Sequence, residues 1–178
     1  MELFILAHEY GHITAGHIGA SPPSGGREAV LRFAWDQELE ADRVGLYLSM
    51  HALRHDGVDV AHAAVGPVVT FLCHQLIDRT LGILAFNRVM EGVGSGSHPP
   101  ATLRRQHVHE VLASFAPPDT LSSQAQYIAS VDGAIGAMWK VVEPRLRAAR
   151  AAGCAPDPHW STQLYGLATL PDADATLL

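Results

Sequence analysis

The chain has 178 residues, of which 48% are hydrophobic and 17% are charged, and this composition excludes a disordered protein. Its length fits one domain with a sizeable core. The net charge of −6 argues against a nucleic-acid-binding protein, which would normally carry a basic patch.

The first predicted helix covers residues 2–17 and carries the sequence H-E-Y-G-H at positions 8–12. Two histidines four residues apart share one face of a helix, with their Cβ atoms about 6 Å apart. The imidazoles of His8 and His12 can therefore converge on one metal ion, as in zinc hydrolases that carry an H-E-x-x-H helix. Glu9 lies off that axis, so its carboxylate can act on a water molecule beside the metal without being a ligand.

The residues around this motif refine the prediction. They are mostly apolar, which indicates a buried helix. Gly11 is the only helix-weakening residue, at a cost of about 1 kcal/mol relative to alanine, so we predict a close neighbour there.

The metzincin pattern would need glycine at position 15 and histidine at position 18, where the chain has Ala15 and Ile18. We reject the metzincin class and interpret His17 as a histidine favoured by the dipole at the helix end.

The second predicted helix covers about residues 28–54 and contains the sequence E-L-E-A-D at positions 38–42. A zinc hydrolase uses three protein ligands and leaves one position open for water. Glu38 and Asp42 are four residues apart and share a helix face. We predict that Glu38 is the third ligand and that Asp42 accepts the spare N–H of a ligand histidine. Asp42 or Asp36 as the third ligand is the alternative.

One long helix, or two helices, is predicted over residues 60–90. Residues 60–77 carry no formal charge, but histidines, a glutamine, a glycine and a proline interrupt this stretch. A membrane-spanning helix needs about 20 predominantly apolar residues. We therefore predict a core helix kinked at Pro67 and no transmembrane helix, with peripheral membrane association as an alternative. Cys73 lies in this apolar run and is predicted to be a buried thiol.

A glycine-rich loop over residues 92–100 is predicted to precede the next helix, which ends near Phe115. Ser97 can cap this helix, with Pro99 or Pro100 in its first turn. The loop brings a histidine, His98, to the start of the helix, and we hypothesise that Gly92, Gly94 and Gly96 let the loop move this histidine on and off the metal.

Two more helices are predicted, over residues 120–142 and 144–152, and the tail at 153–178 is predicted to be irregular. No alternating strand pattern is found. The predicted fold is therefore mainly α, with little or no sheet, as a single helical domain over residues 1–152.

Three motifs together resemble the gluzincin zinc metallopeptidases of the HtpX, CAAX-prenyl protease and Oma–BepA group. The family has H-E-x-x-H followed by E-x-x-A-D on a later helix, as at positions 8–12 and 38–42 here. The sequence G-S-H-P-P at 96–100, with Arg104 six residues after the histidine, looks like the family's S-x-H-P segment and its downstream arginine. The first two motifs also look like those of phage-associated metallopeptidases of the ImmA/IrrE and Lit kinds, which are the second family considered.

The resemblance implies a zinc ion held by three ligands, namely His8, His12 and Glu38. It implies that Glu9 is the general base and that Asp42 supports a ligand. It also implies that His98 and Arg104 border the active site, where His98 can cap the metal at rest. Family members have strands before the H-E-x-x-H helix, and one of these pairs with extended substrate. Since Met1 already lies inside the predicted helix, we expect this strand to be missing, or to come from a partner or a preceding segment.

These features predict a zinc-dependent metalloendopeptidase acting on a protein or peptide substrate. The developing oxyanion needs a hydrogen-bond donor, for which His98 or Arg104 is the candidate. The alternative function is a non-catalytic zinc domain that binds a partner. No signal peptide is visible, so we expect a cytoplasmic protein if Met1 is the natural start.

Overall fold

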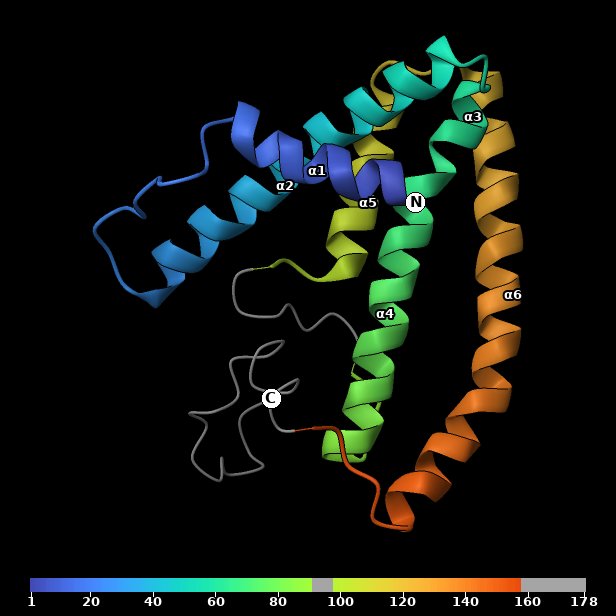
Figure 1. The fold of residues 1–178 in the computed structure, drawn as a ribbon. Helices are drawn as coiled ribbons and strands as arrows, with labels where there is room; N and C mark the ends of the chain where they lie inside the picture. Colours follow the sequence, from blue (N-terminus) through green and yellow to red (C-terminus); the bar gives the residue numbers. More distant parts are fainter. Residues whose placement is uncertain (91–97, 158–178) are drawn as a thin grey trace.

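The computed structural model describes residues 1–90 and 98–157, and this part of the chain is helical, without a β-strand (Figure 1). The mainly α prediction is confirmed. The helices in chain order are α1 (Glu2–Thr14), α2 (Arg27–His55), α3 (Val60–Ala63), α4 (Val65–Phe86), α5 (Ala101–Ala113) and α6 (Pro118–Ala151).

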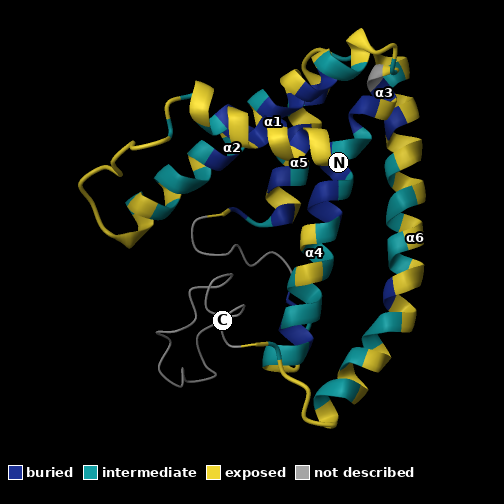
Figure 2. Ribbon diagram, in the orientation of Figure 1, coloured by how far each residue is buried: buried dark blue, intermediate teal, exposed yellow. Residues whose placement is uncertain are grey.

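The hydrophobic core lies where α1, α2, α4 and α5 meet (Figures 1 and 2). Phe4 of α1 packs edge-on against Phe71 of α4, with ring centroids 5.7 Å apart. Leu46 of α2 and Leu112 of α5 complete the centre of this cluster and are almost fully buried. Packing in the core therefore determines which face of α1 is turned toward α2. The H-E-x-x-H motif lies next to this part of α1.

Helices α1 and α2 approach each other closely because each presents a glycine to the other. A Cβ atom on Gly11 would lie 2.9 Å from the carbonyl oxygen of Ala41. A Cβ atom on Gly45 would lie 2.9 Å from the Cα of His8. Both contacts are with backbone, so only glycine allows this separation. The predicted close neighbour of Gly11 is thus Ala41, and the contact holds His8 directly against α2.

Helix α1, which was predicted to be buried, is buried on one face only. Phe4, Ala7, His8 and Gly11 are buried. The opposite face exposes large apolar side chains, among them Leu6 at 69%. Spacings of three and four residues between the buried positions place them along a single stripe of the helix.

The region predicted as one long helix or two divides at Ala64, between α3 and α4. Pro67 lies in the first turn of α4 and cannot donate to the carbonyl of Ala63 four residues back, so the interruption falls at Ala64, three residues before the position where the kink was predicted. Among the described residues, the helical stretch Ala61–Phe86 is long and apolar enough, by length and composition, to cross a membrane. Of an apolar 18-residue segment within it, 33% is buried. Cys73 is half-buried rather than buried.

Two predicted helix ends are wrong. Helix α1 ends at Thr14 instead of residue 17, because Gly16 takes the left-handed conformation with φ of 75° that terminates helices. Helix α6 continues through Pro144, where a break was predicted. Pro144 and Lys140 are both exposed, so solvent can reach the part of the helix where the proline cannot bond the carbonyl of Lys140. The predicted capping residue Ser97 lies outside the described residues, and α5 begins at Ala101 rather than at a proline.

Candidate metal centre

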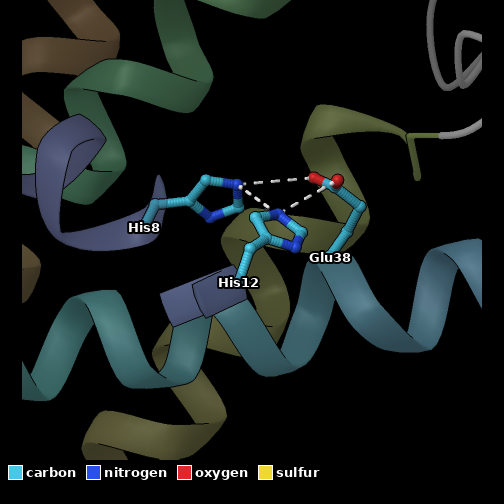
Figure 3. A group of neighbouring side chains, drawn as sticks. All are labelled: His8, His12 and Glu38. Atoms are coloured by element: carbon cyan, nitrogen blue, oxygen red, sulfur yellow. Dashed lines mark hydrogen bonds and ion pairs between the residues drawn. The ribbon is translucent and has the colours of Figure 1, made fainter. Parts of the chain in front are cut away.

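Three predicted ligands come together between α1 and α2 (Figure 3). The Nε2 atoms of His8 and His12 are 3.2 Å apart. Glu38 faces both, with Oε2 3.6 Å from Nε2 of His8 and Oε1 3.4 Å from Nε2 of His12. The ligand atoms all lie within 4.8 Å of one another, so a single ion could contact all three. Two of these atoms come from α1, where His8 and His12 are one turn apart. The third comes from Glu38 on α2, which packs closely against α1.

The buried carboxylate of Asp42 holds His8 from the side away from Glu38. Asp42 Oδ1 lies 2.9 Å from Nδ1 of His8. Arg104 donates to both oxygens of Asp42, from Nη2 to Oδ1 at 2.6 Å and from Nε to Oδ2 at 2.7 Å. Burial raises the pKa of Asp42, but the hydrogen bonds from Arg104 and His8 outweigh this and leave the pKa below its ordinary value. Asp42 is therefore ionised.

An ionised Asp42 fixes the tautomer of His8. A carboxylate can only accept, so Nδ1 of His8 carries the proton and Nε2 presents its lone pair toward His12 and Glu38. Nη2 of Arg104 lies 3.4 Å from the same Nδ1, but both atoms are then donors, so this approach is not a hydrogen bond. Nε2 of His8 is thus available to bind a metal ion. The contact between Asp42 and Nδ1 of His8 is the one that was predicted between Asp42 and a ligand histidine.

Arg104 contacts other residues of the site and does not extend toward solvent. Its side chain is almost buried, and its guanidinium carbon lies 4.9 Å from the ring centre of Phe71. Nη2 also lies 3.4 Å from Oε2 of Glu38. Burial lowers the pKa of Arg104, but its bonds to Asp42 and the charge of Glu38 outweigh this and raise it. Because its donors point at Asp42 and Glu38, Arg104 is poorly placed to serve as the oxyanion donor.

The Oε2 atom of Glu38 is buried and accepts no hydrogen bond within the part of the chain that the structure describes. A buried carboxylate oxygen without a hydrogen-bond donor is costly unless a cation faces it, and here Nη2 of Arg104 lies 3.4 Å away and a bound metal ion would add a second cation. The alternative third ligands are less suitable: both oxygens of Asp42 are bonded to Arg104, and Asp36 is exposed. The chemistry of this donor set, two imidazole nitrogens and a carboxylate, fits a zinc ion.

Glu9 and His98 are the two predicted site residues that are exposed. Burial lowers the pKa of His12, and the negative charges of Glu38 and Glu9 act in the opposite direction. His98 places Nε2 3.5 Å from Oε1 of Glu38, and its side chain is 51% exposed. The glycines at 92–96, predicted to move His98, lie outside the described residues.

One residue of the site was misinterpreted from the sequence. His17 lies beyond the end of α1, and its Nδ1 is 2.9 Å from Nδ1 of His12. Its Nε2 is 3.3 Å from Oε2 of Glu40. His17 therefore contacts a predicted ligand instead of only facing the helix dipole. The available signal was a histidine five residues after His12 and directly after a glycine that can turn the chain back.

Comparison of the chain with protein-family models, with curated proteins and with solved structures found no match. The interpretation of the site therefore depends on its own geometry and chemistry.

Proposed function

We propose that the chain is a zinc-dependent metalloendopeptidase in which His8, His12 and Glu38 hold the metal. The observation that carries this proposal is the convergence of the three ligand atoms, all within 4.8 Å of one another. The bond between His8 and Asp42 supports it, because it leaves the metal-binding nitrogen of His8 without a proton. A zinc ion bound there would polarise a carbonyl and lower the pKa of a water molecule toward about 7.

Glu9 is the proposed general base. Its carboxylate is exposed and directly follows the ligand His8 in sequence. In this role Glu9 takes a proton from the attacking water and delivers it to the nitrogen that leaves when the peptide bond breaks. An exposed carboxylate suits this task, since among the described residues Glu9 takes part in none of the buried ion pairs that occupy Asp42.

His98 is the proposed donor to the oxyanion. It approaches Glu38 from a half-exposed position, so its imidazole lies both near the ligands and within reach of solvent. Arg104 is assigned instead to supporting Asp42 and Glu38, as its contacts at 2.6–3.4 Å indicate. A preorganised donor of the kind assigned to His98 is typically worth 10²–10³ in rate, or about 3–4 kcal/mol.

The alternative is a non-catalytic zinc domain. Structural zinc sites usually have four protein ligands and are rich in cysteine. Here the group that the described residues form has three members and includes no cysteine. A three-ligand set leaves a position for water, and this favours the catalytic proposal.

The test compares Glu9→Gln with the wild type and with Glu2→Gln, a matched substitution of an exposed glutamate on the same helix. Zinc content is measured by elemental analysis, and hydrolysis is measured on unfolded casein. Glu9→Gln is expected to keep stoichiometric zinc and to lose at least 10²-fold in hydrolysis, while Glu2→Gln keeps both. A zinc-loaded wild type that cleaves nothing, or a Glu9→Gln variant as active as the wild type, would favour the non-catalytic domain.

A further inference from the structure

The second ligand histidine has a support of its own, separate from the one that Asp42 gives His8. His12 Nδ1 lies 2.9 Å from Nδ1 of His17, and the two rings have centroids 5.0 Å apart. Nε2 of His17 lies 3.3 Å from Oε2 of Glu40 on α2. These contacts form a continuous polar chain from the ligand His12 to the surface carboxylate of Glu40.

The local backbone explains why His17 returns to His12. Gly16 adopts the left-handed conformation, and the backbone N–H of His17 donates to the carbonyl of His12 at 2.9 Å. The turn therefore fixes His17 against the last part of α1. The side chain of His17 is only 8% exposed, while that of Glu40 is 46% exposed. Arg43, one turn along α2, binds Oε1 of Glu40 and leaves Oε2 to His17.

The direction of the hydrogen bonds follows from the chemistry of a ligand histidine. His12 faces His8 and Glu38 through Nε2, so binding a metal there requires the proton of its neutral ring to be on Nδ1. That Nδ1–H then donates to Nδ1 of His17. His17 must in turn carry its own proton on Nε2, which lies beside the carboxylate of Glu40.

We propose that His17 and Glu40 are positioning residues that hold His12 in the tautomer and orientation needed for metal binding. This inference rests on the proposed function, because it assigns the two residues to the same zinc centre. The two ligand histidines are thus supported unequally. His8 is held by a buried carboxylate locked to Arg104, whereas His12 is held by a neutral imidazole that depends on an exposed carboxylate.

The test uses two substitutions at one position. In His17→Asn the amide oxygen replaces Nδ1 as an acceptor, whereas His17→Leu fills similar space without one. Zinc affinity is measured with zinc alone, by competition with a chromophoric chelator. His17→Leu is expected to weaken zinc binding 10–100-fold, and His17→Asn to recover most of this loss. Glu40→Ala is expected to have a smaller effect, because water can replace an exposed acceptor. The control His51→Leu removes an exposed histidine of α2 and should change nothing.

A second measurement reads the tautomer without any substitution. Long-range ¹H–¹⁵N correlation spectra of the metal-free wild type, at a pH where His12 is neutral, should show its proton on Nδ1. A proton on Nε2 of His12 would overturn the inference, even if His17→Leu failed to fold. Zinc binding by His17→Leu that equals the wild type, or no recovery in His17→Asn, would also overturn it. A wild type that binds no zinc would instead overturn the proposed function, and the inference with it.

Discussion

The contact between Gly45 and the backbone of His8 allows a direct test of how α1 and α2 form the proposed metal centre. A Cβ atom at position 45 would lie 2.9 Å from both N and Cα of His8, and 3.3 Å from the carbonyl carbon of Ala7. These are backbone atoms, so no rotation of a side chain relieves the clash. In Gly45→Ala the two helices must move apart, and the helix that carries two ligands moves relative to Glu38.

Two opposing terms set the size of the effect on the free energy of unfolding. Alanine in place of glycine inside a helix stabilises it by about 1 kcal/mol. Overpacking a tight contact costs about 1–3 kcal/mol. Gly133 of α6 is the matched control, because a Cβ atom there meets nothing within 4 Å. Gly133→Ala should therefore gain about 1 kcal/mol, and Gly45→Ala should be less stable than Gly133→Ala by about 1–3 kcal/mol.

The assay is urea denaturation of the metal-free proteins, followed by zinc titration. For a chain of this length, each kcal/mol corresponds to about 2–4 °C in Tm, so the two variants should also separate in a thermal scan. Gly45→Ala should bind zinc more weakly than the wild type, while Gly133→Ala should not. If Gly45→Ala were stabilised as much as Gly133→Ala and kept its zinc affinity, the close approach of the helices at His8 would be refuted.

Two more predictions concern the charged groups. Arg104→Met should destabilise the protein by about 3–5 kcal/mol, because it leaves Asp42 buried without its partner. The neighbouring Arg105→Met, which breaks a half-exposed pair with Asp132, should cost at most about 1 kcal/mol, and equal losses in urea denaturation would contradict this reasoning. Stability of the metal-free protein should rise with pH up to about 6.5, because burial lowers the pKa of His12 and the unfolded chain then binds the additional proton. A urea midpoint with the same pH dependence in His12→Gln would count against this assignment. The lowered pKa of Asp42 contributes stability above about pH 3.9, which should be lost as the pH falls through the folded-state pKa.

Local spacing made part of the site predictable. His8 and His12 share a face because they are one helical turn apart, and Gly11 indicated a neighbour that proves to be Ala41. Glu38 was predicted as the third ligand because it shares a face of the next helix with Asp42, which was predicted to bind a ligand histidine. These predictions depend on helix periodicity, which the sequence determines directly.

Other features depend on contacts that no local pattern contains. Arg104 reaches Asp42 across 62 positions of the chain, and its partner could not be deduced from its neighbours in sequence. The contact of His17 with His12 depends on the left-handed turn at Gly16, which also ends α1 earlier than predicted. The continuous path of α6 through Pro144 fits its exposed position, where water can reach the carbonyl that a proline leaves unbonded.

The sparse burial of α6 has a consequence for how the molecule opens. This helix has 34 residues and lies beside α4 (Figure 1), yet only two of its residues, Gln124 and Trp139, are buried. Regions with few buried apolar contacts open at low free energy, while a packed core opens only with the whole fold. His8, His12 and Glu38 lie on α1 and α2, beside the core that these helices share with α4 and α5. Amide hydrogens of α6 can therefore exchange with solvent through local unfolding while the proposed metal centre stays assembled.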